Sequence, residues 1–289
     1  MQTLNIIGAG QLGKTLGRLW HQSGLFRIQS IHNRTLRSGQ AAREFIGAGQ
    51  ACPTLQSMPV ADYWLIACQD IEISALAERL SKRPGNREGT VFFHCSGALS
   101  SEALDILRPA SIASAHPVHS FADPLRSLDS LPGSSVALEG DGPATRALGG
   151  AFNAIGCEII TIEARHKPLY HAGSVFACNY LTTLVDLSLR SFAAAGIERG
   201  SALKLLAPIV LQTARNNMTL GPEKSLTGPI ARGDLDTVSK QVENLISVDP
   251  QMARCYRHLG LACVALAQRG PLSEESATRL IELLSEPPR

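Results

Sequence analysis

Apolar and polar residues alternate in short blocks over the first part of the chain. An apolar run at residues 4–7 leads through a turn into leucines at helical spacing from Leu12 onward, which predicts a strand followed by an amphipathic helix. Further strand-like runs occur at residues 26–31, 61–68, 90–95, 111–115, 135–139 and 157–162. Strands that alternate with helices predict an α/β fold with a doubly wound parallel sheet.

After Glu163 the apolar residues recur at helical spacing, and no further strand is predicted. A long helix is expected to continue to Ala194, with an apolar set in the core: Leu169, Phe176, Tyr180, Leu184 and Leu187. Later helices are expected over residues 202–217, after a cap at Asp234, and over residues 250–268 and 274–284. We therefore expect two domains, an α/β domain at residues 1–163 and an all-helical domain at residues 164–289.

Composition and charge exclude several classes of protein. Charged residues make up 18% of the 289 residues, and 27 Lys and Arg nearly balance 25 Asp and Glu. This balance leaves no broad basic surface for nucleic acid or an anionic membrane. The seven cysteines include no CxxC pair, so neither a disulfide framework nor a zinc site is predicted. With no recognisable leader or membrane-spanning run, we expect a cytoplasmic protein that acts on a small molecule.

The turn after the first strand contains a glycine motif. It has the sequence Gly8-Ala9-Gly10-Gln11-Leu12-Gly13. In such a turn Gly8 permits a tight bend, Gly10 lets the backbone approach a pyrophosphate, and Gly13 lets the helix pack closely on the strand. The free N–H groups at the start of the helix supply an anion site. Because the motif lies between a strand and a helix, it predicts a dinucleotide-binding Rossmann domain, with these six residues at the cofactor.

The end of the second strand indicates which dinucleotide is bound. A site for NAD usually has an Asp or Glu here for the ribose hydroxyls, but this chain has His32, Asn33, Arg34 and Thr35. Asn33 can bond the ribose and Thr35 a phosphate, while Arg34 can clamp a 2′-phosphate, with Arg37 as a second cation. The alternative is a solvated basic turn. We expect NADP as the cofactor in preference to NAD.

Reactive groups are expected at the carboxyl ends of the strands, where ligands bind in sheets of this kind. Cys68 and Gln69 follow one strand and are predicted to contact the cofactor. Ser96 and His116 follow the next two strands. Because histidine titrates near neutral pH, His116 is a candidate to exchange a proton with the substrate, and Ser96 is a candidate to orient it. The alternative for His116 is a bond to nearby backbone.

His116 and His119 form an HxxH pattern. In an extended segment the two rings do not share a face, and no third ligand is evident nearby, so no metal site is predicted.

A polar stripe begins the long helix of the second domain. Lys167, His171, Ser174 and Cys178 recur at steps of three and four residues and therefore share one helix face. Such a face is either solvated or forms the wall of a cleft, and the Lys–His pair at its start favours the cleft. Lys167 and His171 are therefore added to the candidate catalytic residues.

Together these motifs resemble bacterial proteins that join a Rossmann-like domain to a helical domain of unknown function. The resemblance is carried by the glycine turn and by residues 33–35, 94–98, 116–117, 166–171, 226–229 and 232–234. More distantly, the chain resembles the 6-phosphogluconate dehydrogenase superfamily, which includes ketopantoate reductase, prephenate dehydrogenase and pyrroline-5-carboxylate reductase. This resemblance implies an NAD(P)-binding domain followed by a helical domain that dimerises and closes the cleft.

Individual residues match parts of that superfamily. His116-Pro117 resembles the His-Pro turn of prephenate dehydrogenase, whose histidine binds the hydroxyl that is oxidised, and Ser96 resembles the serine that precedes it. Lys167 is placed like the catalytic lysine of the hydroxyacid dehydrogenases, but His171 stands where those enzymes usually have asparagine. This departure leaves the substrate open.

We therefore expect an NADP-dependent oxidoreductase, a homodimer through its helical domain. It would transfer a hydride to or from a small polar keto or hydroxy acid or an imine in the interdomain cleft. His116 or Lys167 would exchange the proton, while His171 and Ser96 would orient the substrate. Two alternatives remain open: a non-catalytic regulator or scaffold that binds NADP(H), and a metal-dependent hydrolase that uses His116 and His119.

Overall fold

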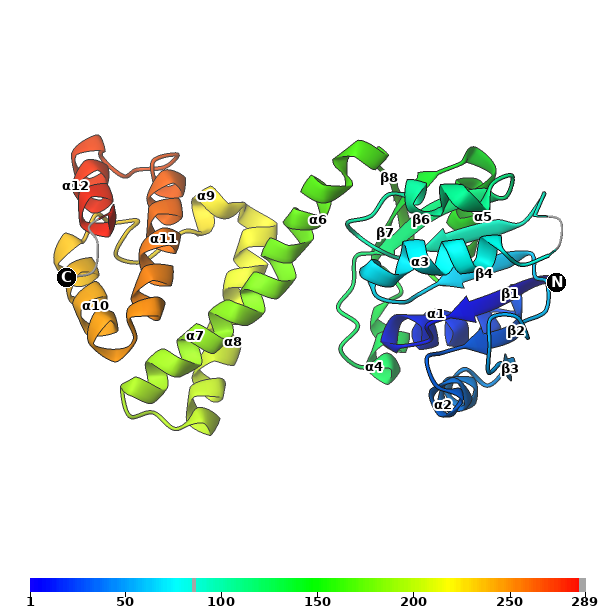
Figure 1. Ribbon diagram of the computed structural model, residues 1–289. Helices are drawn as coiled ribbons and strands as arrows, with labels where there is room; N and C mark the ends of the chain where they lie inside the picture. Colours follow the sequence, from blue (N-terminus) through cyan, green and yellow to red (C-terminus); the bar gives the residue numbers. More distant parts are fainter. Residues whose placement is uncertain (85–86, 286–289) are drawn as a thin grey trace. The chain divides into compact units, whose positions relative to one another are not determined.

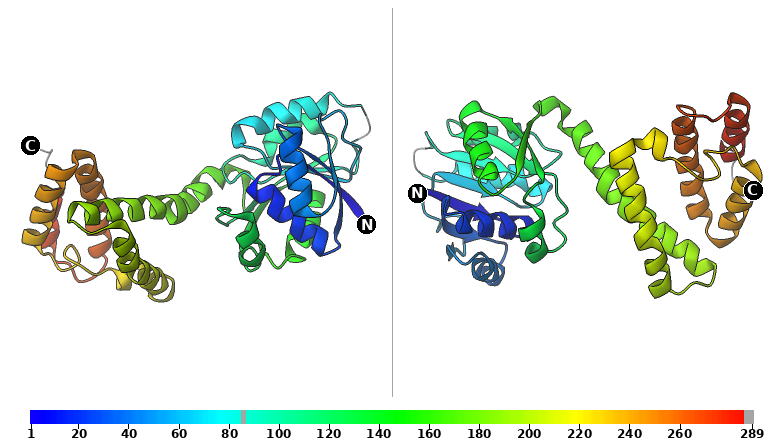
Figure 2. Two further views of the ribbon diagram at one scale, coloured as in Figure 1. Left: turned by 90° about the horizontal axis from the view of Figure 1, so that it is seen from below. Right: turned by 180° about the vertical axis from the view of Figure 1, so that it is seen from behind.

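The computed structural model describes residues 1–84 and 87–285, and the chain forms two compact units (Figures 1 and 2). We call Met1–Cys178 the sheet unit and Asn179–Arg289 the helical unit. The boundary predicted after Glu163 falls just behind the last strand, whereas the compact units divide within the long helix that follows it.

The sheet unit is built on one eight-stranded sheet in the order β3-β2-β1-β4-β5-β6-β7-β8. Its strands are β1 Gln2–Ile7, β2 Phe26–His32, β3 Gln50–Ala51, β4 Tyr63–Ile66, β5 Val91–His94, β6 Ser111–Pro117, β7 Ser135–Gly140 and β8 Glu158–Thr161. Neighbouring strands are parallel except β6 and β7, which pair antiparallel. The chain extends the sheet from β1 first in one direction and then, from β4, in the other. This confirms the predicted doubly wound α/β fold, with the β6–β7 pair as a departure from a fully parallel sheet.

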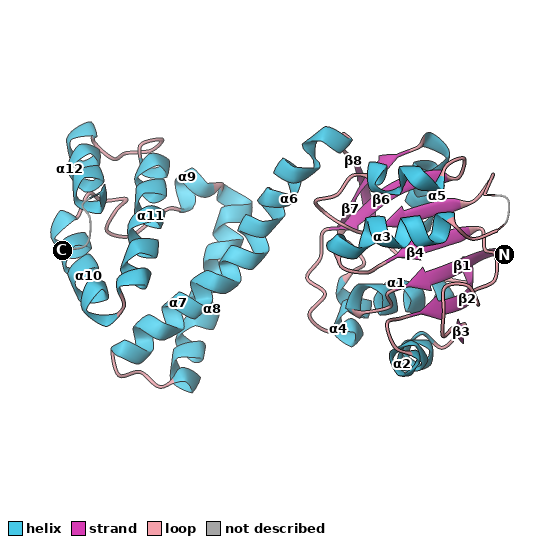
Figure 3. Cartoon of the chain, in the orientation of Figure 1, coloured by secondary structure: helices cyan, strands magenta, loops and turns pink. Residues whose placement is uncertain are grey.

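Helices pack on both faces of this sheet (Figure 3). They are α1 Gln11–Gln22, α2 Leu36–Ile46, α3 Asp70–Ser81 and α5 Gly142–Asn153, with the short 3-10 helix η1 Ser101–Leu107. The sheet unit also contains α4 Pro124–Ser130, the 3-10 helix η2 Ala164–His166 and α6 Lys167–Val175. Successive side chains of a strand point to opposite faces, so β4 places Leu65 in the cluster with α1, α2 and α5, and Trp64 in the cluster with α3 and η1.

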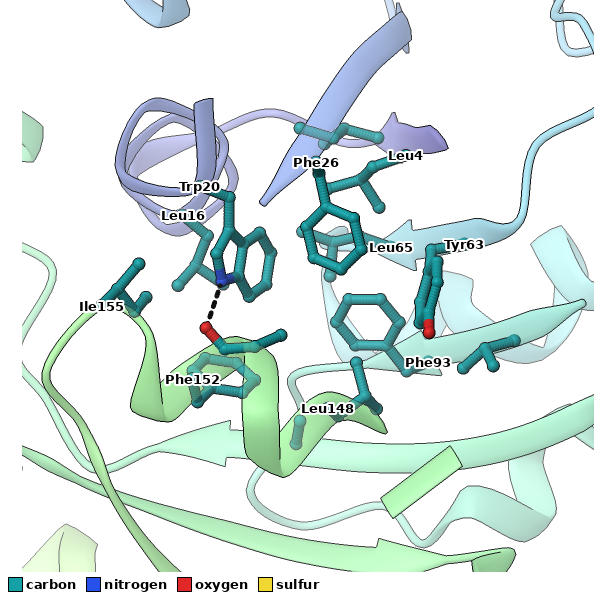
Figure 4. Packing of buried hydrophobic residues seen from close by; sticks show 14 of the residues in the cluster. Leu4, Leu16, Trp20, Phe26, Tyr63, Leu65, Phe93, Leu148, Phe152 and Ile155 are labelled. Atoms are coloured by element: carbon teal, nitrogen blue, oxygen red, sulfur yellow. Dashed lines mark hydrogen bonds between the residues drawn. The ribbon is translucent and has the colours of Figure 1, made fainter. Parts of the chain in front are cut away.

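Aromatic rings form the centre of the first cluster (Figure 4). Trp20 of α1 meets Phe26, Phe93 and Phe152 edge to face, with ring centroids 5.5, 6.2 and 5.1 Å away. The indole N–H of Trp20 donates to the carbonyl oxygen of Ala151 at 2.9 Å, so its polar atom is satisfied inside the core. These contacts attach α1 and α5 to the sheet and fix the position of the turn that precedes α1.

The helical unit contains no strand in its described part, as predicted. Its helices are α7 Leu181–Ala194, α8 Arg199–Leu220, α9 Pro222–Ser225, α10 Leu235–Val248, α11 Pro250–Ala267 and α12 Glu274–Ser285. A π-helical turn, η3 Phe176–Tyr180, joins α6 to α7. The predicted cap is confirmed, because the Asp234 carboxylate accepts a hydrogen bond from the backbone N–H of Thr237 at 3.1 Å. No helix in the described ranges is long and apolar enough to cross a membrane.

The apolar set predicted to lie in the core of the long helix is largely exposed, so that prediction is wrong. Leu169 is 78% exposed, Phe176 69% and Leu184 39%. Helical spacing identifies an apolar face, but it does not say which surface covers that face. Within one chain, this face remains uncovered.

Candidate functional site

The glycine turn lies between the carboxyl end of β1 and the start of α1. Gly8 has φ +82°, and a Cβ there would lie 2.8 Å from the backbone nitrogen of Cys68. A Cβ on Gly13 would lie 3.2 Å from the carbonyl oxygen of Gly8, whereas a Cβ on Gly10 would meet nothing closer than 3.9 Å. Gly8 and Gly13 are thus needed for packing, and the backbone at Gly10 is left open to a ligand.

Two polar residues after β2 have local partners. The side-chain oxygen of Asn33 accepts from the backbone N–H of Ala9 at 2.7 Å, so Asn33 braces the glycine turn. The Thr35 hydroxyl accepts from the backbone N–H of Ser38 at 3.2 Å and caps α2. The bonds predicted for Asn33 to the ribose and for Thr35 to a phosphate stay predictions. Each side chain also stabilises the backbone around it.

A pocket of about 280 Å³ lies beside this turn. It is lined by Ile7, Gly8, His32, Asn33, Arg34, Cys68, Glu72, Ala75, Leu76 and Arg79. Four of the predicted cofactor residues, Gly8, Asn33, Arg34 and Cys68, therefore come together from β1, β2 and β4. Burial, reinforced by Glu72, raises the pKa of the Cys68 thiol to about 12, so this side chain is a neutral wall of the pocket.

The other predicted cofactor residues lie around the same turns but do not line this pocket. Gln69 is an exposed residue at the start of α3, and the Gln11 amide reaches the carbonyl oxygen of Ala122 at 3.5 Å. Ala9 is buried and Leu12 partly buried within the first core cluster. The predicted contacts of these residues with a cofactor are not tested by the structure.

Ser96 lies in the turn after β5 and has all its hydrogen-bonding groups engaged. Its hydroxyl donates to Asp70 Oδ2 at 2.7 Å and accepts from the backbone N–H groups of Ala98 and Leu99 at 3.2 and 2.9 Å. Its backbone N–H donates to Nδ1 of His94 at 3.2 Å. Because the hydroxyl has these three partners, it shapes the turn, and the substrate contact predicted for it stays a prediction.

Lys167 begins α6 and has no exposed surface. Its ammonium donates to the carbonyl oxygen of Ser96 at 2.9 Å and to the Ser114 hydroxyl at 2.6 Å, and Glu139 Oε1 lies 3.8 Å away. The Glu139 carboxylate also accepts from the backbone N–H and hydroxyl of Ser101, at 2.7 and 2.8 Å. Burial lowers the pKa of Lys167, and the charge of Glu139 acts in the opposite direction. Lys167 thereby attaches α6 to β5, β6 and β7.

His116, Tyr170 and His171 form an imidazole–phenol group at the carboxyl end of β6. The Tyr170 hydroxyl lies 2.8 Å from Nδ1 of His116. The ring centroids of His116 and His171 are 5.7 Å apart, at 82°. A Cβ on Gly97 would lie 2.4 Å from Nδ1 of His171 and 2.9 Å from Nε2 of His116, so a side chain at this position would require the two rings to move. The structure therefore brings both predicted histidines together.

Burial lowers the pKa of His116 to about 4, and the charges of Lys167 and His171 act in the same direction. The ring is therefore neutral at neutral pH. Burial also raises the pKa of Tyr170 to about 12, so its phenol keeps its proton.

The hydrogen-bond partners of His119 lie outside the group of His116, Tyr170 and His171. Its ring nitrogens lie 3.3 Å from the Ser130 hydroxyl and 3.4 Å from the Ser134 hydroxyl. Within residues 1–84 and 87–285, no three His, Cys, Asp or Glu side chains are grouped so that they could hold a metal ion.

Sequence reasoning missed Tyr170, Glu139 and Arg79. Tyr170 lies three residues after Lys167 and one before His171, so helical spacing could have placed it near the same face. A glutamate in the apolar run of β7, where it is buried, was a second available signal. Arg79 carried no signal, because only the tertiary fold brings α3 to the same pocket as the ends of β1 and β2.

Two family models match the chain. Residues 2–119 match the Rossmann-like domain, and residues 134–263 match a domain of unknown function, DUF2520. The chain is a Rossmann-like protein with a DUF2520 domain. This confirms the resemblance indicated by its motifs. The DUF2520 match begins just before β7, so it includes Glu139, Lys167 and Tyr170 as well as the first helices of the helical unit. No curated protein matches the sequence.

Several solved structures have the same fold. A Bacteroides fragilis protein to which an NADP oxidoreductase activity is ascribed is 21% identical, with a TM-score of 0.77 over 91% of this chain and 97% of that one. A Thermotoga maritima protein is 24% identical, with a TM-score of 0.70 over 92% and 98%. The 1-pyrroline-5-carboxylate reductase of Streptococcus pyogenes is 13% identical, with a TM-score of 0.60 over 97% and 98%. At these identities the likeness establishes a common fold.

Proposed function

We propose that this protein is an NADP-dependent oxidoreductase whose chemistry takes place beside His116. The observation that carries the proposal is the glycine turn of β1, where Gly8 is packed against the turn after β4 and the backbone at Gly10 is open. The fold shared with a protein described as an NADP oxidoreductase and with a pyrroline-5-carboxylate reductase supports the same reaction class.

The residues around the turn fit NADP(H). The first N–H groups of α1 would hold the pyrophosphate, and the pocket of about 280 Å³ would take the adenosine end. Arg34 after β2 and Arg79 on α3 both line this pocket, and two cations suit a 2′-phosphate. No carboxylate ends β2, where one would bond the ribose hydroxyls of NAD. When bound, the nicotinamide supplies or accepts a hydride equivalent.

For the substrate, we propose a small polar keto or hydroxy acid or an imine. The neutral His116 ring would bond the reacting polar atom of the substrate, with His171 beside it. We assign Lys167 to positioning, because its buried ammonium is occupied by Ser96 and Ser114.

The first experiment measures the affinity of the protein for NADPH and NADH by calorimetry. Arg34→Ala should weaken NADPH binding by about 10- to 100-fold, because it removes a charge-assisted bond to phosphate, and should leave NADH binding nearly unchanged. Arg37→Ala is the comparison variant: Arg37 was expected from the sequence as a second cation but does not line the pocket, so its loss should leave NADPH binding nearly unchanged. Equal losses for the two cofactors would contradict a 2′-phosphate site at Arg34.

The second experiment follows nicotinamide absorbance with a panel of keto acids, hydroxy acids and cyclic imines. Turnover with at least one compound would support an oxidoreductase. Tight NADPH binding without turnover of any compound would instead support a non-catalytic NADP(H)-binding regulator.

We also propose that the protein is a cytoplasmic homodimer through its helical unit. Large apolar side chains are exposed on α7 and α8, and α8 has no charged residue between Lys204 and Arg215. An uncharged apolar helix face is typical of the centre of a homodimer interface, where the same patch of two copies meets about a twofold axis.

A further inference from the structure

The position of the single proton on the neutral His116 ring determines what this residue can do. A neutral imidazole carries hydrogen on either Nδ1 or Nε2, and the other nitrogen is then an acceptor. Burial keeps the pKa of His116 near 4, so the ring is neutral under ordinary conditions. The partner of Nδ1 therefore selects the role of Nε2.

The partner of Nδ1 is the Tyr170 hydroxyl, at 2.8 Å. A phenol whose pKa is raised by burial keeps its proton and needs an acceptor for it. Among the described residues, Nδ1 of His116 is the one acceptor within hydrogen-bond distance of this hydroxyl. If Nδ1 donated instead, no described residue would accept the phenol proton. The geometry therefore favours Tyr170 as donor and Nδ1 as acceptor.

We propose that Tyr170 is a positioning residue that holds His116 with its proton on Nε2, so that His116 meets its ligand as a hydrogen-bond donor. No described residue hydrogen-bonds Nε2, which leaves this N–H for a bound molecule. The inference rests on the proposed function only in taking that molecule to be the substrate.

This arrangement determines the class of substrate atom that fits. A carbonyl oxygen or an unprotonated imine nitrogen accepts a bond from Nε2–H, and the bond strengthens as negative charge develops on that atom. Removing the proton of a hydroxyl group would need an unprotonated Nε2. The site therefore fits a substrate whose reacting atom accepts a hydrogen bond, a carbonyl oxygen or an imine nitrogen, and in this tautomer His116 does not act as the base that removes a hydroxyl proton.

The surrounding chain holds the pair in place. Lys167 lies one turn before Tyr170 on α6, and its buried ammonium attaches this turn to Ser96 and Ser114. On the other side, Gly97 packs directly beneath the rings of His116 and His171. The charged and titratable groups that act on the ring are Lys167, His171 and Asp70.

The test is the tautomer of His116 in the cofactor-free protein, read from long-range 15N–1H correlation spectra of 15N-histidine-labelled samples. His116→Asn assigns the signal by its loss. We expect the wild-type ring to be protonated on Nε2, and Tyr170→Phe to shift it toward a mixture with the Nδ1–H form. His94 is an internal reference, because Nε2 lies 3.0 Å from the Ser100 carbonyl oxygen and Nδ1 accepts from Ser96.

Tyr256→Phe is the matched control. It also removes a phenol hydroxyl with a single partner, Gln241 at 2.6 Å, but it lies in the helical unit and should leave the His116 spectrum unchanged. A wild-type ring with a substantial Nδ1–H population, or an unchanged tautomer in folded Tyr170→Phe, would overturn the proposal. The wild-type spectrum tests it even if the variant does not fold.

Kinetics supply a second readout once a substrate is found. Tyr170→Phe should lower kcat about tenfold, since one hydrogen bond is lost, and should leave the affinity for NADPH unchanged. An equal loss in NADPH affinity would indicate a general structural defect and contradict a role confined to His116. Failure of the wild-type protein to bind NADPH would contradict the proposed function but leave the tautomer result intact.

Discussion

The sheet unit and the helical unit differ in how much of their apolar surface one chain buries. Trp20, Phe93 and Phe152 have no exposed surface. In the α7–α8 hairpin, by contrast, the buried hydrophobic cluster has three members, Leu189, Ala202 and Leu206. Ile209 and Leu211 on the same hairpin are 62% and 60% exposed.

An apolar pocket of about 550 Å³, open to the surface, also lies among α7, α8, α10 and α11, lined mainly by leucine and aromatic side chains. An exposed apolar patch of this kind is typical of a surface that binds a partner, which is the observation behind the proposed dimer. Each unit thus has a core of its own, including a cluster of Val238, Val242, Val264, Ala277, Leu280 and Leu284 in the helical unit. The α7–α8 hairpin differs in leaving a broad apolar face exposed, and this is the face that the proposed dimer would bury.

The largest expected effect is the loss of dimer affinity when the proposed interface is disrupted. Ile209→Glu places a charge on the uncovered face and should weaken the dimer by about 100-fold or more, because an unpaired charge would be buried. Light scattering over a concentration series measures it. Ile106→Glu, at a 52% exposed isoleucine of the sheet unit, is the control and should leave the mass unchanged. A wild-type protein that is monomeric at all concentrations would contradict the dimer.

A smaller effect is expected on the free energy of unfolding when one phenylalanine of each unit is truncated. Phe152→Ala should lower the free energy of unfolding of the sheet unit by about 4 kcal/mol, because it leaves a cavity beside Trp20. Both tryptophans lie in this unit, so denaturant unfolding followed by their fluorescence reports on it. Phe192→Ala, at the apolar pocket of the helical unit, should leave this transition within about 0.5 kcal/mol. Equal shifts would show that the units unfold together.

Breaking the buried ion pair between Lys167 and Glu139 should lower the free energy of unfolding slightly less than Phe152→Ala does. Lys167→Met leaves Glu139 charged and buried without its cation, and it should cost about 3 kcal/mol in the same fluorescence assay. The double variant Lys167→Met, Glu139→Gln should recover part of this loss. If the double variant is as unstable as the single one, the cost arises from packing and not from the uncompensated charge.

The smallest effect is a dependence on pH. Burial lowers the pKa of His94 to about 4, so the folded state resists a protonation that the unfolded chain accepts near pH 6.5. The contribution of His94 is therefore present above pH 6.5 and is lost as the pH falls toward 4, by about 1.4 kcal/mol for each pH unit. His116, whose pKa burial also lowers to about 4, acts in the same direction. Fluorescence-detected unfolding between pH 7 and 4.5 measures it. A stability that does not fall over this range would contradict the burial of a neutral ring.

Much of the sheet unit could be predicted because its signals are local. The run of β1, the glycine turn and the spacing in α1 are each set by neighbours along the chain. The cap at Asp234 in the helical unit was predictable for the same reason. The missed features join distant segments. Tyr170 meets His116 across 54 positions, and Lys167 meets Ser96 across 71. Periodicity carries no information on which distant strand end such a helix contacts.

The sequence by itself determined the doubly wound fold, the glycine turn and the identity of the two histidines as candidates, because these follow from residue type and local spacing. Only the tertiary structure decided that Lys167 is buried beside Glu139, that the Ser96 hydroxyl has three protein partners and that Tyr170 bonds His116. The reason is physical. Burial and hydrogen-bond partners depend on which segments pack together, and packing is a property of the folded chain as a whole.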